Sequence, residues 1–452
     1  MITIELLIQM VAISIVAVVI YTFIGFIPGT DETSVLLPIS LGLALAGVQP
    51  VLVLTFFIAS IVSLNLTNMM PTALVGLPGG VLSSPMIEHA ITIKNQGRSA
   101  AAIRKMGAGA LIGVLISVPT SFILAQLIAP FASRIQPYAS LLFVIGAIFL
   151  SLMSKNKILS LVSIIPLAML FMGLRHLYWG TGVVSENTTI TTSFFLGITI
   201  GPLVVSLLEL LNPTKRKAML VNKYKELRIP ATDQKATLNP FKLLTKEEGK
   251  WAALTSFVAN FLFVLSPVGL IILFGEIVHK RVKKEDDKAS ATVVAMSSLA
   301  QSTYLSGIII PLFALGIPLS PVAVGPGNAL FNAEPAYGLD NNLHFQLSTI
   351  QFIVAVAIGA VIALTFVYWL TNRFAFKITN LIMTKVSHEA VLGIFIAFIV
   401  LLAYMDAGLI NVFGVMLIAV TCGALNKIGV NYGIQFMTLY AAPLIIQTLS
   451  RI

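Results

Sequence analysis

Long apolar runs, separated by short polar or proline- and glycine-containing segments, cover almost the whole chain. In the first half they lie at 3–24, 35–46, 51–64, 106–130, 138–153, 158–178 and 192–211. In the second half they lie at 251–279, 289–333, 345–371, 390–405, 408–425 and 429–449. Several approach about 20 residues, the length with which an α-helix crosses a bilayer. The pattern predicts an all-α polytopic membrane protein.

Composition and charge agree with this prediction. The 452 residues are 57% hydrophobic and 10% charged, with a mean hydropathy of +0.97, which is too apolar for a soluble protein of this size. The net charge of +10 comes from basic residues in short loops between apolar runs. Such loops orient a membrane protein, so we expect membrane lipid and no nucleic acid as a partner. The single cysteine, Cys422, excludes an internal disulfide.

One spacing of proline and glycine occurs twice in the chain. Pro-x-x-x-x-Gly-x-Pro covers 71–78 and returns at 311–318, 240 positions later. We interpret this as an internal duplication, with a membrane repeat at 1–211, a basic cytoplasmic linker at 212–250 and a second repeat at 251–452. Because proline and glycine break helices and free backbone groups, each repeat is expected to contain a broken transmembrane helix.

The loop charges predict how the two repeats are oriented. The linker holds ten Lys and Arg against four Asp and Glu, and the loop 94–105 after the first motif is also basic. The loop 334–344 after the second motif has no Lys or Arg. Basic loops stay cytoplasmic, so the repeats are expected to be inverted, with Pro78 facing Pro318 near the membrane centre.

Two re-entrant hairpins complete the predicted architecture. The run 251–279 is interrupted at 266–269 and leaves limbs of about 13 residues, each too short to span. Both of its ends are basic, so it should enter and leave on the cytoplasmic side. By symmetry 3–46 should form a hairpin that enters from outside and turns near Pro28 and Gly29. Both termini are then expected outside the cell membrane.

Broken helices expose N–H groups that suit an anion and carbonyl groups that suit a cation. In the first repeat the candidate substrate-binding residues are Asn65, Thr67, Asn68, Gly76, Pro78, Gly79, Gly80 and Ser83. In the second repeat they are Ser297, Ser298, Gln301, Ser302, Gly316, Pro318 and Ser320. The alternative, that each polar side chain only satisfies helix packing, stays open.

The turn of the first hairpin supplies the candidates for ion coupling: Pro28, Gly29, Thr30, Asp31 and Glu32. If the hairpin is re-entrant, the two acids lie near its tip, where an ionisable group is costly and usually functional. If the turn reaches water, they belong to an ordinary external loop. The sequence leaves both alternatives open.

The sequence carries no pattern that would power ATP-driven pumping or hydrolysis, such as Gly-Lys-Ser/Thr, His-Glu-x-x-His or Gly-x-Ser-x-Gly. We therefore expect a secondary active transporter of a small organic anion that works by alternating access, with a sodium ion or a proton for coupling and no cofactor. An uncoupled channel of the same architecture is the main alternative. A membrane enzyme is disfavoured because no paired carboxylates or histidine cluster occurs.

Several short motifs resemble a known family. They are Gly25-Phe-Ile-Pro-Gly29 followed by Leu36-Leu-Pro38, Gly76-Leu-Pro-Gly79 leading into Lys94-Asn-Gln-Gly-Arg98, and Ile310-Pro-Leu-Phe-Ala-Leu-Gly-Ile-Pro318. Together they are similar to the large membrane subunit of the tripartite tricarboxylate transporters, the TctA-type permeases. The resemblance implies a bacterial inner-membrane symporter of di- or tricarboxylates, citrate among them. It also implies a small membrane subunit and an extracytoplasmic binding protein as partners.

The chain departs from that family pattern in four places, one of which is Pro318-Leu-Ser320 in the second motif. The segment 63–68 stands where the family has Tyr-Gly-Gly-Ser, and 293–300 stands where it has Glu-x-Ala-Asn-Asn-Ala. The second hairpin carries Ser266-Pro-Val-Gly269 in place of Pro-Gly. We therefore expect a divergent member, for which a non-carboxylate small solute is an alternative substrate. A homodimer is one assembly that the sequence allows.

Overall fold

The structure is a computed structural model. It describes residues 2–28, 30, 32–75, 79–96, 98–154, 156–184, 191–209, 211–213, 239–334, 336–385 and 388–451. Most of the predicted linker and four of the predicted site residues, Gly29, Asp31, Gly76 and Pro78, therefore lie outside the described residues. The expected approach of Pro78 to Pro318 stays a prediction for the same reason.

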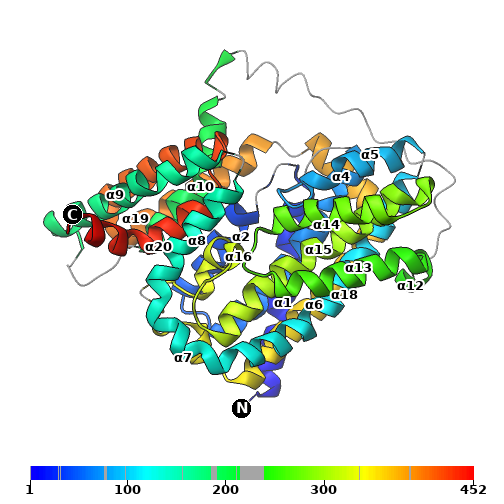
Figure 1. The fold of residues 1–452 in the computed structure, drawn as a ribbon, viewed down its shortest axis with the longest axis horizontal. Coiled ribbons are helices and arrows are strands. Elements are labelled where there is room, and N and C mark those ends of the chain that lie inside the picture. The colour runs from blue at the N-terminus through cyan, green and yellow to red at the C-terminus, as the bar shows by residue number, and fades with distance from the viewer. Residues whose placement is uncertain are drawn as a thin grey trace.

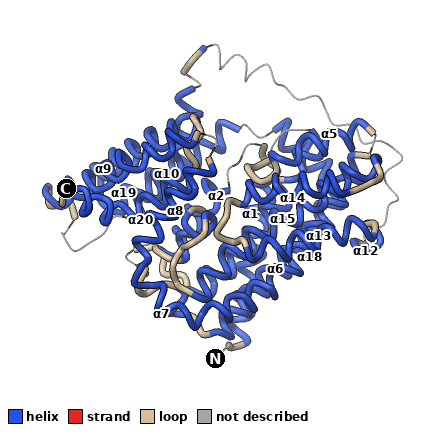
Figure 2. The backbone as a smooth tube through the Cα atoms, viewed as in Figure 1, coloured by secondary structure: helices blue, strands red, loops and turns tan. Residues whose placement is uncertain are grey.

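The described chain is almost entirely helical (Figure 2). Its first half contains α1 Ile4–Gly25, α2 Glu32–Leu45, α3 Pro50–Thr67, α4 Met69–Val75, α5 Ile87–Asn95, α6 Ser99–Ile128, α7 Ala132–Ile135, α8 Ala139–Met153, α9 Lys157–Gly180 and α10 Thr191–Glu209. Its second half contains α12 Pro240–Leu243, α13 Lys246–Phe261, α14 Pro267–Arg281, α15 Glu285–Ala314, α16 Pro321–Val324, α17 Leu343–Gln346, α18 Thr349–Lys385, α19 His388–Lys427 and α20 Tyr432–Leu449.

Seven helical stretches in the described residues are long and apolar enough to cross a membrane. Four of these stretches lie in α1, α9, α18 and α19. Two others, Pro50–Leu74 and Ala101–Met153, each run through consecutive helices, α3 to α4 and α6 to α8. The seventh lies in α15. The prediction of an all-α polytopic membrane protein is confirmed. The side of the membrane on which each loop lies stays a prediction.

The second hairpin has the predicted form, whereas the first differs from it. Helices α13 and α14 have 16 and 15 residues and are joined by a turn that ends at Ser266. Helix α1 has 22 residues, long enough to cross, and only α2, with 14, is short. The sequence 4–25 contains no proline, whereas Pro38 lies inside α2 and Pro267 is the first residue of α14.

One helix boundary differs from the apolar pattern, and another agrees with it. Helix α18 continues beyond 371 to Lys385 and includes Arg373 and Lys377, which the pattern assigned to a loop. Basic side chains are good helix formers, so the helix continues out of the apolar region. The predicted division between the runs 390–405 and 408–425 is confirmed, because the backbone of α19 is not helical at Ala407 and Gly408, and Gly408 has a φ of +70°.

Helices from the two halves interleave instead of forming two separate bodies. Helix α3 packs against α18 and α15 packs against α6, so each half supplies a helix to the other. In the same way α10 packs against α19, and α20 packs against α8 and α9. Figure 1 shows the two resulting groups: α8, α9, α10, α19 and α20 on one side, and α1, α3, α6, α13, α15 and α18 on the other. This reciprocal exchange is what a duplication with pseudo-twofold symmetry produces.

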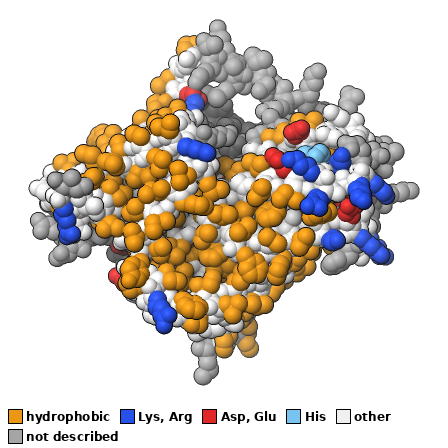
Figure 3. All heavy atoms as spheres, in the orientation of Figure 1, with side chains coloured by type: hydrophobic (Ala, Val, Ile, Leu, Met, Phe, Trp, Pro, Cys, Tyr) orange, Lys and Arg blue, Asp and Glu red, His pale blue; other side chains and the backbone are white. Residues whose placement is uncertain are grey.

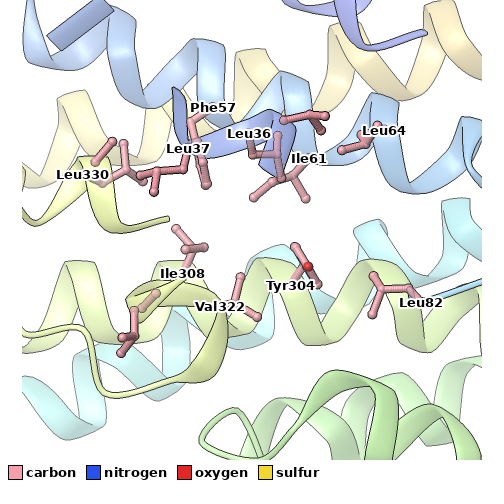
Figure 4. Close-up of a cluster of buried hydrophobic side chains, with 14 of the residues drawn as sticks. Leu36, Leu37, Phe57, Ile61, Leu64, Leu82, Tyr304, Ile308, Val322 and Leu330 are labelled. Carbon is pink, nitrogen blue, oxygen red and sulfur yellow. The ribbon is translucent and has the colours of Figure 1, made fainter. Parts of the chain in front are cut away.

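The centre of the second group is formed by α3 and α15. In the apolar windows of α3–α4 and α15, 89% and 100% of the residues are buried, against 22–44% in the other spans. In Figure 4, Phe57, Ile61 and Leu64 follow one another along α3 in one direction, whereas Tyr304 and Ile308 follow one another along α15 in the opposite direction. Helix α3, which precedes the first motif, and α15, which contains the first residues of the second motif, are therefore antiparallel.

The surface agrees with a bilayer environment. Apolar side chains cover most of the face in Figure 3, and large ones such as Ile158 and Phe413 are more than two thirds exposed. Lysine and arginine side chains gather at one end of the molecule near α5, α13 and α14 (Figure 3). That end contains the basic last turn of α14, with Lys280 and Arg281.

Candidate functional site

A cavity of about 360 Å³ lies where the two groups of helices meet. Its lining residues come from both halves: Glu32, Thr33, Val81, Leu82, Pro202, Ser266, Pro267, Val268, Tyr304, Pro321, Val322, Gly325, Pro326, Asn426, Asn431, Tyr432 and Gly433. The lining is mostly apolar with a few polar groups, and the volume lies within the range of small-molecule sites. We take it as the candidate substrate site.

Corresponding segments of the two halves form this cavity. Val81 and Leu82 follow the first motif, and Pro321 and Val322 lie 240 positions later, after the second motif. The start of α2 and the turn before α14 line it as well, and these are the turns of the two hairpins. Figure 4 shows Leu82, Tyr304 and Val322 close together beside α15. The cavity therefore lies between the repeats, where the motif spacing predicted a site.

Helix N-termini converge on the cavity. Helices α2, α14 and α20 all begin at lining residues, namely Glu32, Pro267 and Tyr432. Two of these ends carry side-chain caps: Ser266 Oγ accepts from the Gly269 N–H at 3.4 Å, and Asn431 Oδ1 accepts from the Gly433 N–H at 2.7 Å. A helix N-terminus carries a partial positive charge and directs its remaining N–H groups outward. Several such ends around one cavity favour an anionic ligand.

The carboxylate of Glu32 connects α2 to residues 79–83, which directly follow the first motif and are called the first motif loop below. Its Oε2 accepts from the Val81 N–H at 3.2 Å, and its Oε1 accepts from the Leu82 N–H at 3.4 Å and from Asn68 Nδ2 at 3.2 Å. Glu32 is 1% exposed. Three donors therefore hold its carboxylate inside the protein, whereas its depth in the membrane stays a prediction.

Gly79 and Gly80 allow the loop to approach these groups closely. A Cβ on Gly79 would overlap the carbonyl group of Asn68. A Cβ on Gly80 would overlap both the Glu32 carboxylate and the Asn68 amide. Ser83 then closes the turn, because its Oγ accepts from the Gly80 N–H at 3.0 Å. The structure thus brings together Thr30, Glu32, Asn68, Gly79, Gly80 and Ser83 from the predicted set.

The second motif is held by different contacts. Gly316 has a φ of +66°, a backbone conformation that glycine adopts without strain, and it ends the last turn of α15. Its carbonyl accepts from Asn342 Nδ2 at 2.7 Å. Ser320 caps α16 by accepting from the Ala323 N–H at 2.9 Å and donates to the Gly307 carbonyl at 2.5 Å. Gly316, Pro318 and Ser320 position the lining residues that follow them and do not line the cavity themselves.

Asn65 of α3 and Gln301 of α15 connect these two helices directly. Asn65 Nδ2 donates to the Ala300 carbonyl at 3.3 Å, and Gln301 Nε2 donates to the Val62 carbonyl at 3.1 Å. Each helix therefore supplies one side-chain amide to the backbone of the other. Both side chains are buried in the α3–α15 interface and do not line the cavity.

The remaining predicted site residues have packing contacts. Thr67 and Ser297 donate to carbonyls four residues earlier in their own helices, at 2.8 and 2.7 Å. Ser302 donates to the Leu299 carbonyl at 3.2 Å, and Ser298 contacts Ser256 of α13 at 2.5 Å. None of these four lines the cavity, so for them the packing alternative accounts for every contact.

The sequence patterns did not identify several residues that line the cavity. Pro202 and Asn426 lie in helices that carry no copy of the motif, and Tyr432 opens α20. Tyr304 was passed over among its Ser, Thr and Gln neighbours. For Asn431 a signal existed, because an asparagine before an apolar run is typical of a helix N-cap.

Comparisons with known proteins point to one family. The model described as "Tripartite tricarboxylate transporter TctA family" matches residues 11–434, which is nearly the whole chain. No curated protein and no solved structure matched the chain.

Proposed function

Because the chain belongs to the tripartite tricarboxylate transporter TctA family, we propose that it is a secondary transporter that carries a small organic carboxylate, with the cavity between its repeats as the substrate site. The observation that carries this proposal is the convergence of helix N-termini on one cavity. An anion of di- or tricarboxylate size suits about 360 Å³.

The position of the cavity supports alternating access as the mechanism of this proposal. It lies between the two groups of helices, and residues of α10 and α20 line it from one side while Tyr304 of α15 lines it from the other. A movement of one group relative to the other would open the cavity first to one side of the membrane and then to the other. We propose that a sodium or proton gradient drives this movement, and that a small membrane subunit and an extracytoplasmic binding protein deliver the substrate.

Uptake into liposomes tests the proposal. The purified chain, reconstituted with and without an inward sodium or proton gradient, is expected to accumulate a radiolabelled carboxylate above its external concentration. Equilibration without accumulation would instead identify an uncoupled channel. A parallel thermal-unfolding screen of carboxylates, sugars and amines identifies the ligand class, since a ligand of the folded state raises its apparent stability. Stabilisation by a sugar or an amine alone would refute a carboxylate substrate.

A variant that fills the cavity ties transport to this site. Val81 lines the cavity and is 43% exposed, so Val81→Phe adds volume there without overpacking the core. We expect it to abolish uptake and carboxylate stabilisation. The matched control is Val361→Phe on the surface of α18, where the residue is 61% exposed. Equal uptake by both variants would place the substrate elsewhere.

A further inference from the structure

We propose that Ile27 and Thr30, between α1 and α2, form a binding site for a sodium ion together with Asn68 and Gly79. Its oxygen ligands are the Thr30 hydroxyl, the Asn68 side-chain oxygen and the backbone carbonyls of Ile27 and Gly79. The role of this ion in coupling rests on the transport function proposed above, whereas its binding to the protein does not.

The strongest observation is the surroundings of the Thr30 hydroxyl. Three acceptor oxygens lie around its Oγ1: the Ile27 carbonyl at 3.1 Å, the Gly79 carbonyl at 3.2 Å and Asn68 Oδ1 at 3.3 Å. A hydroxyl has one hydrogen and can donate to only one of them. All three distances exceed the usual O–H···O length of about 2.7–2.8 Å. Four buried oxygens therefore gather with one hydrogen among them, which is the environment that a hard cation requires.

Glu32 fixes which end of the Asn68 amide faces this cluster. Asn68 Nδ2 donates to Glu32 Oε1 at 3.2 Å. Rotating the amide by half a turn would place its oxygen against the carboxylate, so the observed orientation is the favourable one. The amide oxygen consequently points to Thr30. Asn68 thus connects a negative charge to the oxygen cluster.

The helix ends around the cluster also favour a positive ion. Ile27 lies two positions after the last residue of α1, and Asn68 is the C-cap of α3. The C-terminus of a helix carries a partial negative charge. Carbonyls at helix breaks together with a single nearby carboxylate suit a monovalent cation, and the neutral ligands give a divalent ion too little charge compensation.

The ion would act directly on the wall of the substrate cavity. Gly79 lies in the same loop as Val81 and Leu82, whose N–H groups hold Glu32. Val81, Leu82 and Glu32 line the cavity. A bound cation would fix the loop to the α1–α2 turn and offset the charge of Glu32. Since an uncompensated carboxylate repels an anionic substrate, sodium binding and substrate binding should favour each other.

Thermal unfolding of the purified full-length chain without any carboxylate tests the site. Sodium chloride is expected to raise the apparent melting temperature above that in potassium or choline chloride at equal ionic strength, with a saturable dependence. Thr30→Val should abolish this difference, and Thr30→Ser, which keeps the oxygen, should retain it. Glu32→Gln should raise the half-saturating sodium concentration about 10- to 100-fold, as loss of a ligand's hydrogen-bonding partner commonly does.

The matched control is Thr55→Val, because buried Thr55 donates only to the Val51 carbonyl of its own helix. It should respond to sodium as the unmodified chain does. The site is refuted if Thr30→Val keeps the sodium response, if potassium or choline stabilises equally, or if only a lower pH stabilises, which would indicate a proton on Glu32. If Thr30→Val does not fold, an unchanged sodium response in Glu32→Gln overturns the proposal. Sodium stabilisation without carboxylate uptake would refute the transport function and leave the ion site standing.

Discussion

Replacing Gly80 by alanine should disrupt the contact between α2 and the first motif loop. A Cβ at this position would lie 3.0 Å from Glu32 Cδ and closer still to Oε1 and to Asn68 Nδ2. Glu32 is 1% exposed and held by three hydrogen bonds, which its displacement into the cavity would break. If the loop shifts instead, it moves away from the carboxylate that holds it.

The structure supplies the magnitude of this effect. Overpacking a buried site costs about 1–3 kcal/mol. Each hydrogen bond to a charged group that the shift breaks costs about 1.5–3 kcal/mol more. With one such bond lost, we expect Gly80→Ala to reduce the free energy of unfolding by about 2.5–6 kcal/mol. Because the loop lines the cavity, uptake should fall as well.

Denaturant unfolding in detergent, followed by helix content, measures this change beside liposome uptake. The control is Gly249→Ala in α13, where an added Cβ meets no heavy atom within 4 Å. Alanine there should be neutral or should stabilise by up to about 1 kcal/mol. If Gly80→Ala unfolded at the same denaturant concentration as the unmodified chain and kept its uptake, the close approach of this loop to Glu32 would be wrong.

Three further predictions concern other parts of the fold. Asn65→Ala and Gln301→Ala should each destabilise the protein by about 0.5–1.5 kcal/mol, the net value of one hydrogen bond, and unchanged denaturant midpoints in both would contradict the cross-helix contacts. Lys105 Nζ lies 2.6 Å from Glu248 Oε1 in a buried pair. Lys105→Met should therefore lower the free energy of unfolding by about 3–5 kcal/mol, and adding Glu248→Gln should recover part of that loss. Equal melting temperatures for the single and double variants would argue against this pairing. Burial, and to a smaller extent the neighbouring His279, lowers the pKa of His89 on α5 below its ordinary value. Since the unfolded chain then binds more protons than the folded chain, the free energy of unfolding should fall as the pH drops below about 6.5. An equally steep fall in His89→Gln would assign that loss to other groups.

Much of the architecture could be predicted from the sequence because its signals are local. Apolar runs and breakers located the long helices, including the interrupted pair α13 and α14, but not short ones such as α4 and α5. The repeated proline–glycine spacing located the loops that line the cavity. These features depend on helix length and on backbone conformation, both of which are properties of a short segment.

The identity of the polar site residues depended on the tertiary structure. Ser297 and Ser298 are polar residues of the segment before a motif, as Asn68 is, yet only Asn68 meets the oxygen cluster and the Glu32 carboxylate. Which face of a buried helix meets a loop is set by packing between segments that are distant in sequence. Polar spacing alone does not encode it.

The sequence by itself therefore determined that this is a helical membrane protein with a duplicated break. Only the tertiary structure decided that helices of the two halves are exchanged, that Glu32 is buried against the loop of the first motif, and that Thr30 lies among three acceptor oxygens. The physical reason is the distance along the chain over which each effect acts. Hydrophobicity and helix breaking act within a segment, whereas the compensation of a buried charge or oxygen requires partners that folding brings from elsewhere in the chain.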